Sequence, residues 1–245
     1  MPIHPRLAKA EPMGPFLLPE EFETSEGRKA AWRSLWLHDH GFIRKLHQNT
    51  HKLPGDMIRT GQPSPGDIRR WANEGVKTVI NLRGLRNNVR QPGYWHLERE
   101  ACRENGITMI DHRAYSRAAP KPDFILDLDR MFQSIAYPAL MHCKSGADRA
   151  GLASFLYLFL RCEQPLEDAF RQLSWRYGHV QSGKTGVLDH FVKTYAAAAA
   201  KAGVQPSREH FLNWAGKDYD PSDVQDSFRS SAAGSFLTEQ ILRRE

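Results

Sequence analysis

The chain has 245 residues, of which 40% are hydrophobic and 25% are charged, the composition of a soluble globular protein. This length can hold one large or two small domains, and three cysteines are too few for a disulfide scaffold. The formal net charge of +6 suits an anionic substrate. Because the basic residues are scattered rather than clustered, the charge gives no reason to expect nucleic acid as a partner.

The N-terminal segment lacks the apolar stretch of a secretory signal. The longest apolar run, Leu152–Leu160, is far shorter than the roughly 20 residues that a membrane helix needs, so no membrane span is expected. No cluster of histidine and cysteine has metal-ligand spacing, and we expect neither a metal nor another cofactor. These features together predict a cytoplasmic protein.

The predicted elements alternate between short apolar strands and amphipathic helices once the N-terminal part has been passed. Residues 1–24 are expected to form a proline-containing leader, and residues 25–40 a helix. Strands are expected over residues 57–60, 76–82, 107–110 and 139–142. Helices are expected after the N-cap Ser64 and over residues 93–104, 122–135, 148–162, 166–177 and 186–201, and residues 203–245 are also expected to be helical.

This alternation predicts an α/β fold with a central, mostly parallel sheet flanked by helices. The chain divides into an N-terminal leader and helix over residues 1–40, a main domain over residues 41–202 and a helical C-terminal extension over residues 203–245. Active sites of such sheets lie at the carboxyl ends of the strands, where the strand 139–142 ends at Cys143.

The loop after this strand carries the residues that point to chemistry. It contains His142 and the run Cys143, Lys144, Ser145, Gly146, Ala147, Asp148 and Arg149, and a helix follows. A strand, a tight loop and a helix direct backbone N–H groups and the positive end of the helix dipole at one spot. A phosphate there also meets the guanidinium of Arg149, which can bind two oxygens at once. The same surroundings favour the thiolate form of Cys143, a nucleophile at neutral pH.

The pattern His142-Cys143-x5-Arg149, with Gly146 at the third position after the cysteine, resembles the signature loop of the cysteine-dependent protein tyrosine phosphatases. It is most similar to the dual-specificity and bacterial branch, and the resemblance covers residues 57–160. It implies a protein tyrosine phosphatase-like fold, with residues 41–202 as the phosphatase domain. It also implies hydrolysis of phosphate monoesters through a phosphocysteine on Cys143, on phosphotyrosine or dual-specificity protein substrates. The substrate phosphate would be bound by residues 144–149, with Arg149 as the central cation.

Two aspartates are candidates for the general acid that protonates the leaving group. Asp111 follows the strand 107–110 and is therefore expected at the active-site edge, as the acid is in many dual-specificity phosphatases. Asp148 lies inside the loop, where Cys-x4-Asp-Arg resembles myotubularin-type and some bacterial phosphatases, in which the loop aspartate is the acid. A helix-capping role for Asp148 and a turn role for Asp111 remain open. We favour Asp148.

Other features of the loop bear on substrate and rate. Ala150 stands where the family commonly has a serine or threonine whose hydroxyl stabilises the departing thiolate, so hydrolysis of the phosphocysteine is expected to be slow. Lys144 is shared with phosphoinositide-type phosphatases, which makes a phosphoinositide or another small phosphoester an alternative substrate. A non-catalytic phosphate-binding module is a further alternative. The segment 175–179 is interpreted as a helix cap with packed aromatic side chains that can also wall the pocket.

Overall fold

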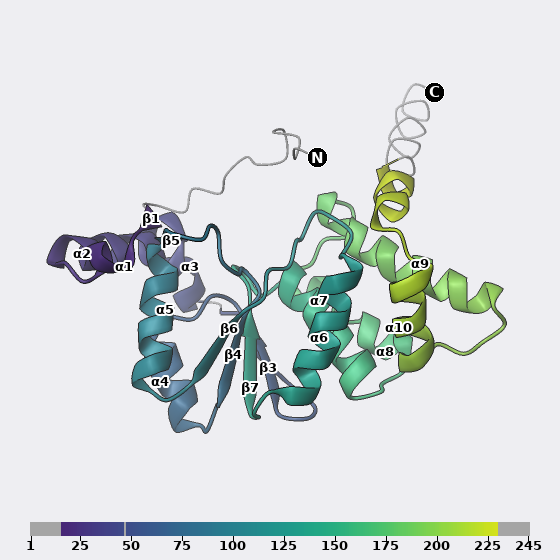
Figure 1. Ribbon diagram of the computed structural model, residues 1–245, viewed down its shortest axis with the longest axis horizontal. Helices are drawn as coiled ribbons and strands as arrows, with labels where there is room; N and C mark the ends of the chain where they lie inside the picture. Colours follow the sequence, from purple (N-terminus) through teal and green to yellow (C-terminus); the bar gives the residue numbers. More distant parts are fainter. Residues whose placement is uncertain (1–15, 47, 230–245) are drawn as a thin grey trace.

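The computed structural model describes residues 16–46 and 48–229, and its centre is a five-stranded sheet (Figure 1). The strand order is β2-β3-β7-β4-β6, and all neighbours are parallel except β2 and β3. The strands are β2 (His51–Leu53), β3 (Met57–Thr60), β4 (Thr78–Asn81), β6 (Thr108–Asp111) and β7 (Ala139–His142). The predicted α/β class with a mostly parallel sheet is confirmed, and the predicted strand 139–142 is β7 itself.

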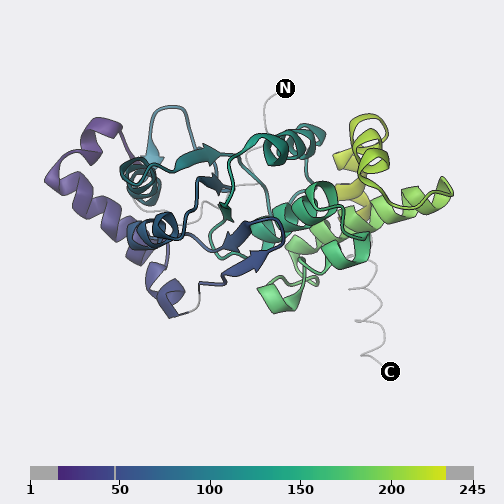
Figure 2. The same cartoon turned by 90° about the horizontal axis from the view of Figure 1, so that it is seen from below.

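Helices cover both faces of this sheet, because successive residues of each strand point to opposite sides. On one face Ile58, Val79 and Leu140 pack under α4 (Pro65–Asn73) and α5 (Gly93–Glu104). On the other face Met57, Ile80 and Met141 belong to the larger core beneath α6 (Pro122–Ser134) and α7 (Asp148–Leu156). Figures 1 and 2 show these two helical layers on either side of the strands.

The N-terminal elements pack against the outside of α5. The short strands β1 (Phe16–Leu17) and β5 (Gln91–Pro92) pair, and α1 (Pro19–Phe22), α2 (Ser25–Arg33), the π-helix η2 (Ser34–His38) and α3 (Gly41–Leu46) complete this part. Arg28 of α2 binds Glu100 of α5 through two hydrogen bonds of 2.7 and 2.9 Å. The single helix predicted over residues 25–40 corresponds to two consecutive elements, α2 and η2. Residues 1–15 of the predicted leader lie outside the described residues.

The C-terminal half adds a second layer of helices over α6 and α7. The π-helix η3 (Tyr157–Arg161) extends α7, and α8 (Leu166–Phe170), η4 (Trp175–Tyr177), η5 (Lys184–Gly186), α9 (Val187–Lys201) and α10 (Arg208–Lys217) follow. Residues 221–229 are also helical, and residues 230–245 of the predicted extension lie outside the described part of the chain. Phe211, Trp214 and Tyr219 belong to the main core, so the described part of the extension packs as one body with the sheet.

One predicted helix is shorter than expected. The sequence predicts a helix over residues 166–177, whereas α8 ends at Phe170. The backbone carbonyl and side chain of Gln172 instead accept hydrogen bonds from Arg59 at 3.0 and 2.7 Å. These bonds to a buried charge replace the helical bonds and end the helix.

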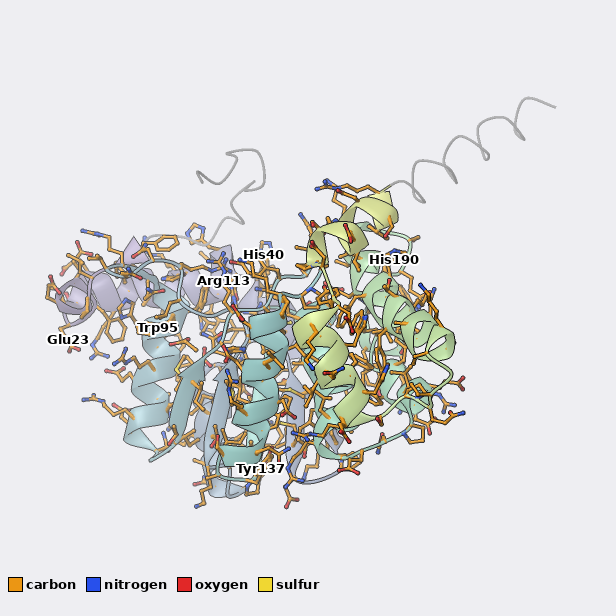
Figure 3. The ribbon with its side chains drawn as sticks, turned by 45° about the vertical axis from the view of Figure 1, so that its right-hand side comes forward. Glu23, His40, Trp95, Arg113, Tyr137 and His190 are labelled. Atoms are coloured by element: carbon orange, nitrogen blue, oxygen red, sulfur yellow. The ribbon has the colours of Figure 1, made fainter. Side chains whose placement is uncertain are left out.

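The four parallel strands bring their carboxyl ends to one edge of the sheet. Thr60, His142, Asn81 and Asp111 are aligned in register at this edge. In Figure 3, Arg113, which follows β6, lies at the opposite end of the sheet from Tyr137, which precedes β7. The loop that begins with Cys143 is therefore on the Arg113 side, as predicted from the direction of the strands.

Candidate active site

The candidate site is the loop of residues 143–147 between β7 and α7. The left-handed backbone of Gly146, with φ of 75°, lets the loop turn tightly against β3. A Cβ at this position would lie 2.9 Å from the backbone nitrogen of Gly61 and 3.0 Å from the carbonyl carbon of Thr60. Helix α7 begins at Asp148, and its N-cap Ala147 supplies no side-chain hydrogen bond. The start of this helix is therefore open to an anion.

The carbonyl groups of the loop all face the body of the protein. From Lys144 to Ala147, four consecutive carbonyl oxygens accept hydrogen bonds from outside the loop. The Lys144 carbonyl accepts from the backbone N–H of Gln62 at 3.1 Å, and the Ser145 carbonyl accepts from Asn49 Nδ2 at 3.1 Å. The last two accept from Nη2 of Arg59 at 2.6 and 3.2 Å. This arrangement fixes the direction of each peptide unit in the loop.

The amide groups of the same peptides consequently face the other way. Among the described residues, no acceptor binds the N–H groups of Lys144, Ser145, Gly146, Asp148 and Arg149. The Ala147 amide makes only a long contact of 3.4 Å with its neighbour Ser145 Oγ. Several unpaired N–H groups that follow one another in a turn and a helix start form an anion-binding nest.

A buried cysteine and a partly exposed arginine accompany this nest. Cys143 is only 2% exposed, so its sulfur lies at the bottom of the loop. Arg149 is partly exposed and has no hydrogen-bond or ion-pair partner in the part of the chain that the structure describes. By contrast, the nearby guanidinium groups of Arg59 and Arg83 are fully buried and bound to protein oxygens. Arg149 is thus the arginine of the site that can bind a ligand.

The sequence analysis missed Arg59, which lies in β3 beneath the loop. Burial lowers the pKa of its guanidinium to about 10, although electrostatic attraction to the acidic groups of Cys143, Tyr177 and Asp148 acts to raise it. The group therefore remains a cation at neutral pH. Its carbon Cζ lies 4.2 Å from the ring centre of Tyr177. A charged residue inside an otherwise apolar strand is the signal from which this buried cation could have been suspected.

A buried polar network starts at His142, the residue before Cys143. Nε2 of His142 lies 2.6 Å from Oε1 of Glu98 on α5. The other carboxylate oxygen of Glu98 accepts from the side chain of Gln62 at 2.7 Å, and Gln62 accepts from Arg83 at 2.8 Å. His142 therefore faces a carboxylate of α5, and Glu98 was not among the site residues predicted from the sequence.

The network ends at a buried carboxylate beside the loop. Asp39 binds Arg83 through bonds of 2.7 and 2.8 Å and Arg44 at 2.8 Å. Burial raises the pKa of Asp39, but the charges and hydrogen bonds of Arg83, Arg44 and Lys144 outweigh it and hold that pKa below its usual value. Nζ of Lys144 lies 3.8 Å from the same carboxylate. The residues on both sides of Cys143 are therefore anchored to one network.

Asp148, the first residue of α7, contacts a histidine that the sequence analysis had placed in a helix cap. Nδ1 of His179 lies 2.8 Å from Oδ1 of Asp148, and Nε2 of His179 lies 2.6 Å from Oδ2 of Asp189 on α9. Burial lowers the pKa of His179, but the hydrogen bonds and charges of the two carboxylates outweigh it and raise that pKa to about 9. No fixed sequence spacing links three residues from three separate elements, so this contact was not predictable.

Asp111, the other candidate acid, is bound from two sides. Its carboxylate accepts from Asn81 Nδ2 at 2.7 Å and from Trp95 Nε1 at 3.0 and 3.1 Å. Burial raises the pKa of Asp111, and these hydrogen bonds oppose that effect. It lies on β6, two strands from β7, which corresponds to about 10 Å at roughly 4.8 Å per strand. Asp148, by contrast, directly follows the loop as the first residue of α7.

Within residues 16–46 and 48–229, no group of three or more His, Cys, Asp or Glu side chains is arranged to hold a metal ion. No helix of this described part combines the length and apolar character needed to cross a membrane.

No protein-family model matches the chain, and no curated protein matches its sequence. Several solved structures are similar to it. TpbA of P. aeruginosa has 17% identity over 60% of this chain and 84% of its own, with a TM-score of 0.48. A DUF442 protein of Shewanella putrefaciens has 18% identity over 62% and 95%, with a TM-score of 0.47. PTPMT1 has 18% identity over 62% and 99%, with a TM-score of 0.44. At these identities the similarity concerns the fold alone.

Proposed function

We propose that the protein is a phosphatase that hydrolyses phosphate monoesters through a phosphocysteine on Cys143. The observation that carries this proposal is the set of unpaired loop amides that faces away from four anchored carbonyls. The loop also holds the recessed Cys143, and Arg149, which has no partner among the described residues, lies in the first turn of the helix that follows. Such donors are oriented before the substrate arrives, so they can stabilise the charge of the transferring phosphoryl group without reorganising.

The reaction has two steps. In the first, the Cys143 thiolate attacks phosphorus in line; an S–P bond forms as the bond to the leaving oxygen breaks, and that oxygen takes a proton. In the second, water attacks phosphorus, gives up a proton and displaces the thiolate. Arg149 and the loop amides bind the phosphoryl oxygens in both steps and bind them more strongly in the transition state. Neither step needs a metal ion.

We assign the proton transfers to Asp148. Its side chain is 26% exposed and starts the helix that Arg149 continues, so it lies next to the bound phosphate. Oδ1 contacts His179, and Oδ2 has no hydrogen-bond partner among the described residues. Asp111 is less suited, because donors occupy its carboxylate two strands away.

A phosphorylated protein, most of all one with phosphotyrosine, is the substrate that we propose. Because Cys143 is recessed, the phosphate must reach below the surface, and the phenol ring of tyrosine holds its phosphate farther from the peptide backbone than serine does. A reducing compartment keeps such a thiolate active, so we place the protein in the cytoplasm.

A phosphoinositide or another small phosphoester is the second candidate. Lys144 follows the nucleophile, and its side chain is 22% exposed. Together with Arg44 and Arg83 it gives this side of the loop more positive than negative charge around Asp39. A second phosphate on the substrate would be attracted to this charge.

The test is the activity of purified protein with metal removed. Cys143→Ser is expected to abolish turnover of an aryl phosphate while vanadate still binds, and Cys162→Ser, which changes a cysteine outside the site, should retain activity. Retained turnover in Cys143→Ser would overturn the cysteine mechanism. Absence of turnover in the unchanged protein, with phosphate still bound, would favour a non-catalytic binding module. A panel of phosphotyrosine peptides, phosphoserine peptides and phosphoinositides would then identify the substrate class.

A further inference from the structure

We propose that His179 is a positioning residue that stores the proton used by Asp148 and is held in this role by Asp189. This inference rests on the proposed function and adds to it the source of the proton. The three residues Asp148, His179 and Asp189, called the proton triad below, come from α7, from the loop after η4 and from α9. Their contacts of 2.8 and 2.6 Å form one continuous chain.

The members of the proton triad differ in how far they are exposed to a substrate. The side chains of His179 and Asp189 are 0% and 4% exposed, whereas that of Asp148 is 26% exposed. Only Asp148 can therefore touch a substrate in the loop, and His179 must act through it. Asp189 lies behind the imidazole, on the side away from Asp148.

The charge of Asp189 requires a cation at His179. Oδ1 of Asp189 is buried and has no hydrogen-bond partner among the described residues, so its bond to His179 is the one contact that compensates this carboxylate. A buried carboxylate is strongly destabilised unless a cation or hydrogen bonds accompany it. The imidazolium form of His179 meets this need and donates one N–H to each neighbouring carboxylate.

The charged groups around His179 act in the same direction. The two carboxylates face it from α7 and α9, and their combined effect raises the pKa of His179 to about 9 despite its burial. Arg59 of β3 interacts with the neighbouring Asp148 through its charge. Among the described residues, the two carboxylates are the charged groups that act on the imidazole. Near neutral pH, one proton therefore belongs to the three groups together and lies mainly on His179.

The proton balance of both steps follows from this arrangement. As the bond to the leaving oxygen breaks, Nδ1 of His179 transfers its proton to Asp148 Oδ1, and Asp148 passes this same proton to the leaving oxygen. The first step ends with a neutral alcohol or phenol, phosphocysteine, ionised Asp148 and neutral His179. In the second step water gives one proton to Asp148 as the thiolate leaves, and Asp148 returns that proton to Nδ1 of His179. The site returns to its starting charge without an added reactant.

The proton triad changes the pH range in which the acid works. An isolated aspartic acid has a pKa near 3.9 and is almost fully ionised at neutral pH. A proton stored on His179, by contrast, remains within one hydrogen bond of Asp148 until the pH approaches the His179 pKa of about 9. We therefore expect kcat for a poor leaving group to fall only in the region of pH 9.

The experiment compares kcat against pH for an alkyl phosphate and a nitrophenyl phosphate in four proteins. These are the unchanged enzyme, His179→Gln, Asp189→Asn and the control His190→Gln on the same helix as Asp189. Glutamine keeps a hydrogen bond to Asp148 but carries no proton for transfer. His179→Gln is expected to lower kcat for the alkyl phosphate at least about 10-fold at pH 7 and the nitrophenyl phosphate much less. Asp189→Asn should lower the His179 pKa, because it removes one of the two carboxylates that raise it. The basic limb of the kcat–pH profile should therefore move to lower pH by about one unit.

Several outcomes would overturn the proposal. An equal loss with both substrates and an unchanged pH profile in His179→Gln would mean a purely structural role. If that variant does not fold, the unchanged enzyme still decides: a basic limb in the range of a free carboxylic acid with the alkyl phosphate contradicts a proton on His179. Failure of the proposed function is distinct, because it would appear as turnover retained in Cys143→Ser.

Discussion

Nη2 of Arg59 donates to the carbonyl oxygen of Gly146 over 2.6 Å, from a fully buried position beneath the loop of residues 143–147. Through this bond an arginine that cannot touch a substrate would support the phosphate binding that we propose. By drawing the loop carbonyls toward β3, it turns the amides of the same peptides toward the space above Cys143. The cation also adds a fixed positive charge below that space.

The first prediction concerns this arginine. Arg59→Met should leave the backbone carbonyls of Gly146 and Gln172 without a donor in a buried place, at roughly 1–3 kcal/mol for each unsatisfied group, whereas Ala147 keeps its bond from the Gly151 amide. The loop amides would then lose their common direction, and vanadate affinity and kcat should both fall by at least about 100-fold. Arg130→Met, which changes an exposed arginine paired with Asp127, is the control. Vanadate affinity unchanged in Arg59→Met would contradict this role.

The second prediction concerns the turn in the loop. Gly146→Ala places a Cβ 2.9 Å from the Gly61 nitrogen at a φ of 75°, so backbone must move. The left-handed conformation alone costs roughly 1–2 kcal/mol for a residue other than glycine. We expect Tm to fall and phosphate binding to be lost. Gly66→Ala is the matched control, since its nearest contact would be 3.8 Å away. Equal behaviour of the two variants would refute the requirement for glycine.

The sequence predicted the fold and the loop because both depend on local patterns. Strand 139–142 and helix 93–104 agree with β7 and α5 to the residue, since apolar runs and helix lengths are encoded locally. What supports the loop comes from far along the chain. Arg59 meets Gly146 across β3 and β7, and His179 meets Asp148 only after a turn that interrupts the predicted helix 166–177. Such contacts depend on tertiary packing, for which one sequence carries no periodic signal.

The third prediction separates the two candidate acids. Asp148→Asn should lower kcat for an alkyl phosphate by about 100-fold or more and for a nitrophenyl phosphate much less, because a good leaving group departs without a proton. Asparagine keeps the size of the side chain and can still accept the hydrogen bond from His179. Asp111→Asn, which can still accept from Asn81 and Trp95, should have a small effect with both substrates. A leaving-group-dependent loss in Asp111→Asn would transfer the acid role to that residue.

The fourth prediction is a dependence of stability on pH. The pKa of His179 rises from 6.5 to about 9 in the folded state, which corresponds to roughly 3 kcal/mol in favour of folding. Because the folded-state pKa is the higher one, this contribution is complete below about pH 6.5 and is lost as the pH rises through about 9. Urea unfolding of the unchanged protein and of His179→Gln should therefore differ most at pH 6 and least at pH 10. A difference that is constant over this range would rule out a protonated His179.

The proposed mechanism depends on the phosphocysteine intermediate. Because residue 150 is alanine, we expect this intermediate to accumulate enough to be measured. Ala150 is fully buried at the start of α7 and has no hydroxyl to stabilise the departing thiolate, so the second step should be slow and the intermediate should accumulate. The direct measurement is the mass of the intact protein after acid quenching during turnover of an aryl phosphate. We expect a protein heavier by one phosphoryl group, with the group on the peptide that contains Cys143, and no such species in Cys143→Ser. Product formation at full rate, without a phosphorylated protein at any time during turnover, would contradict the proposed mechanism.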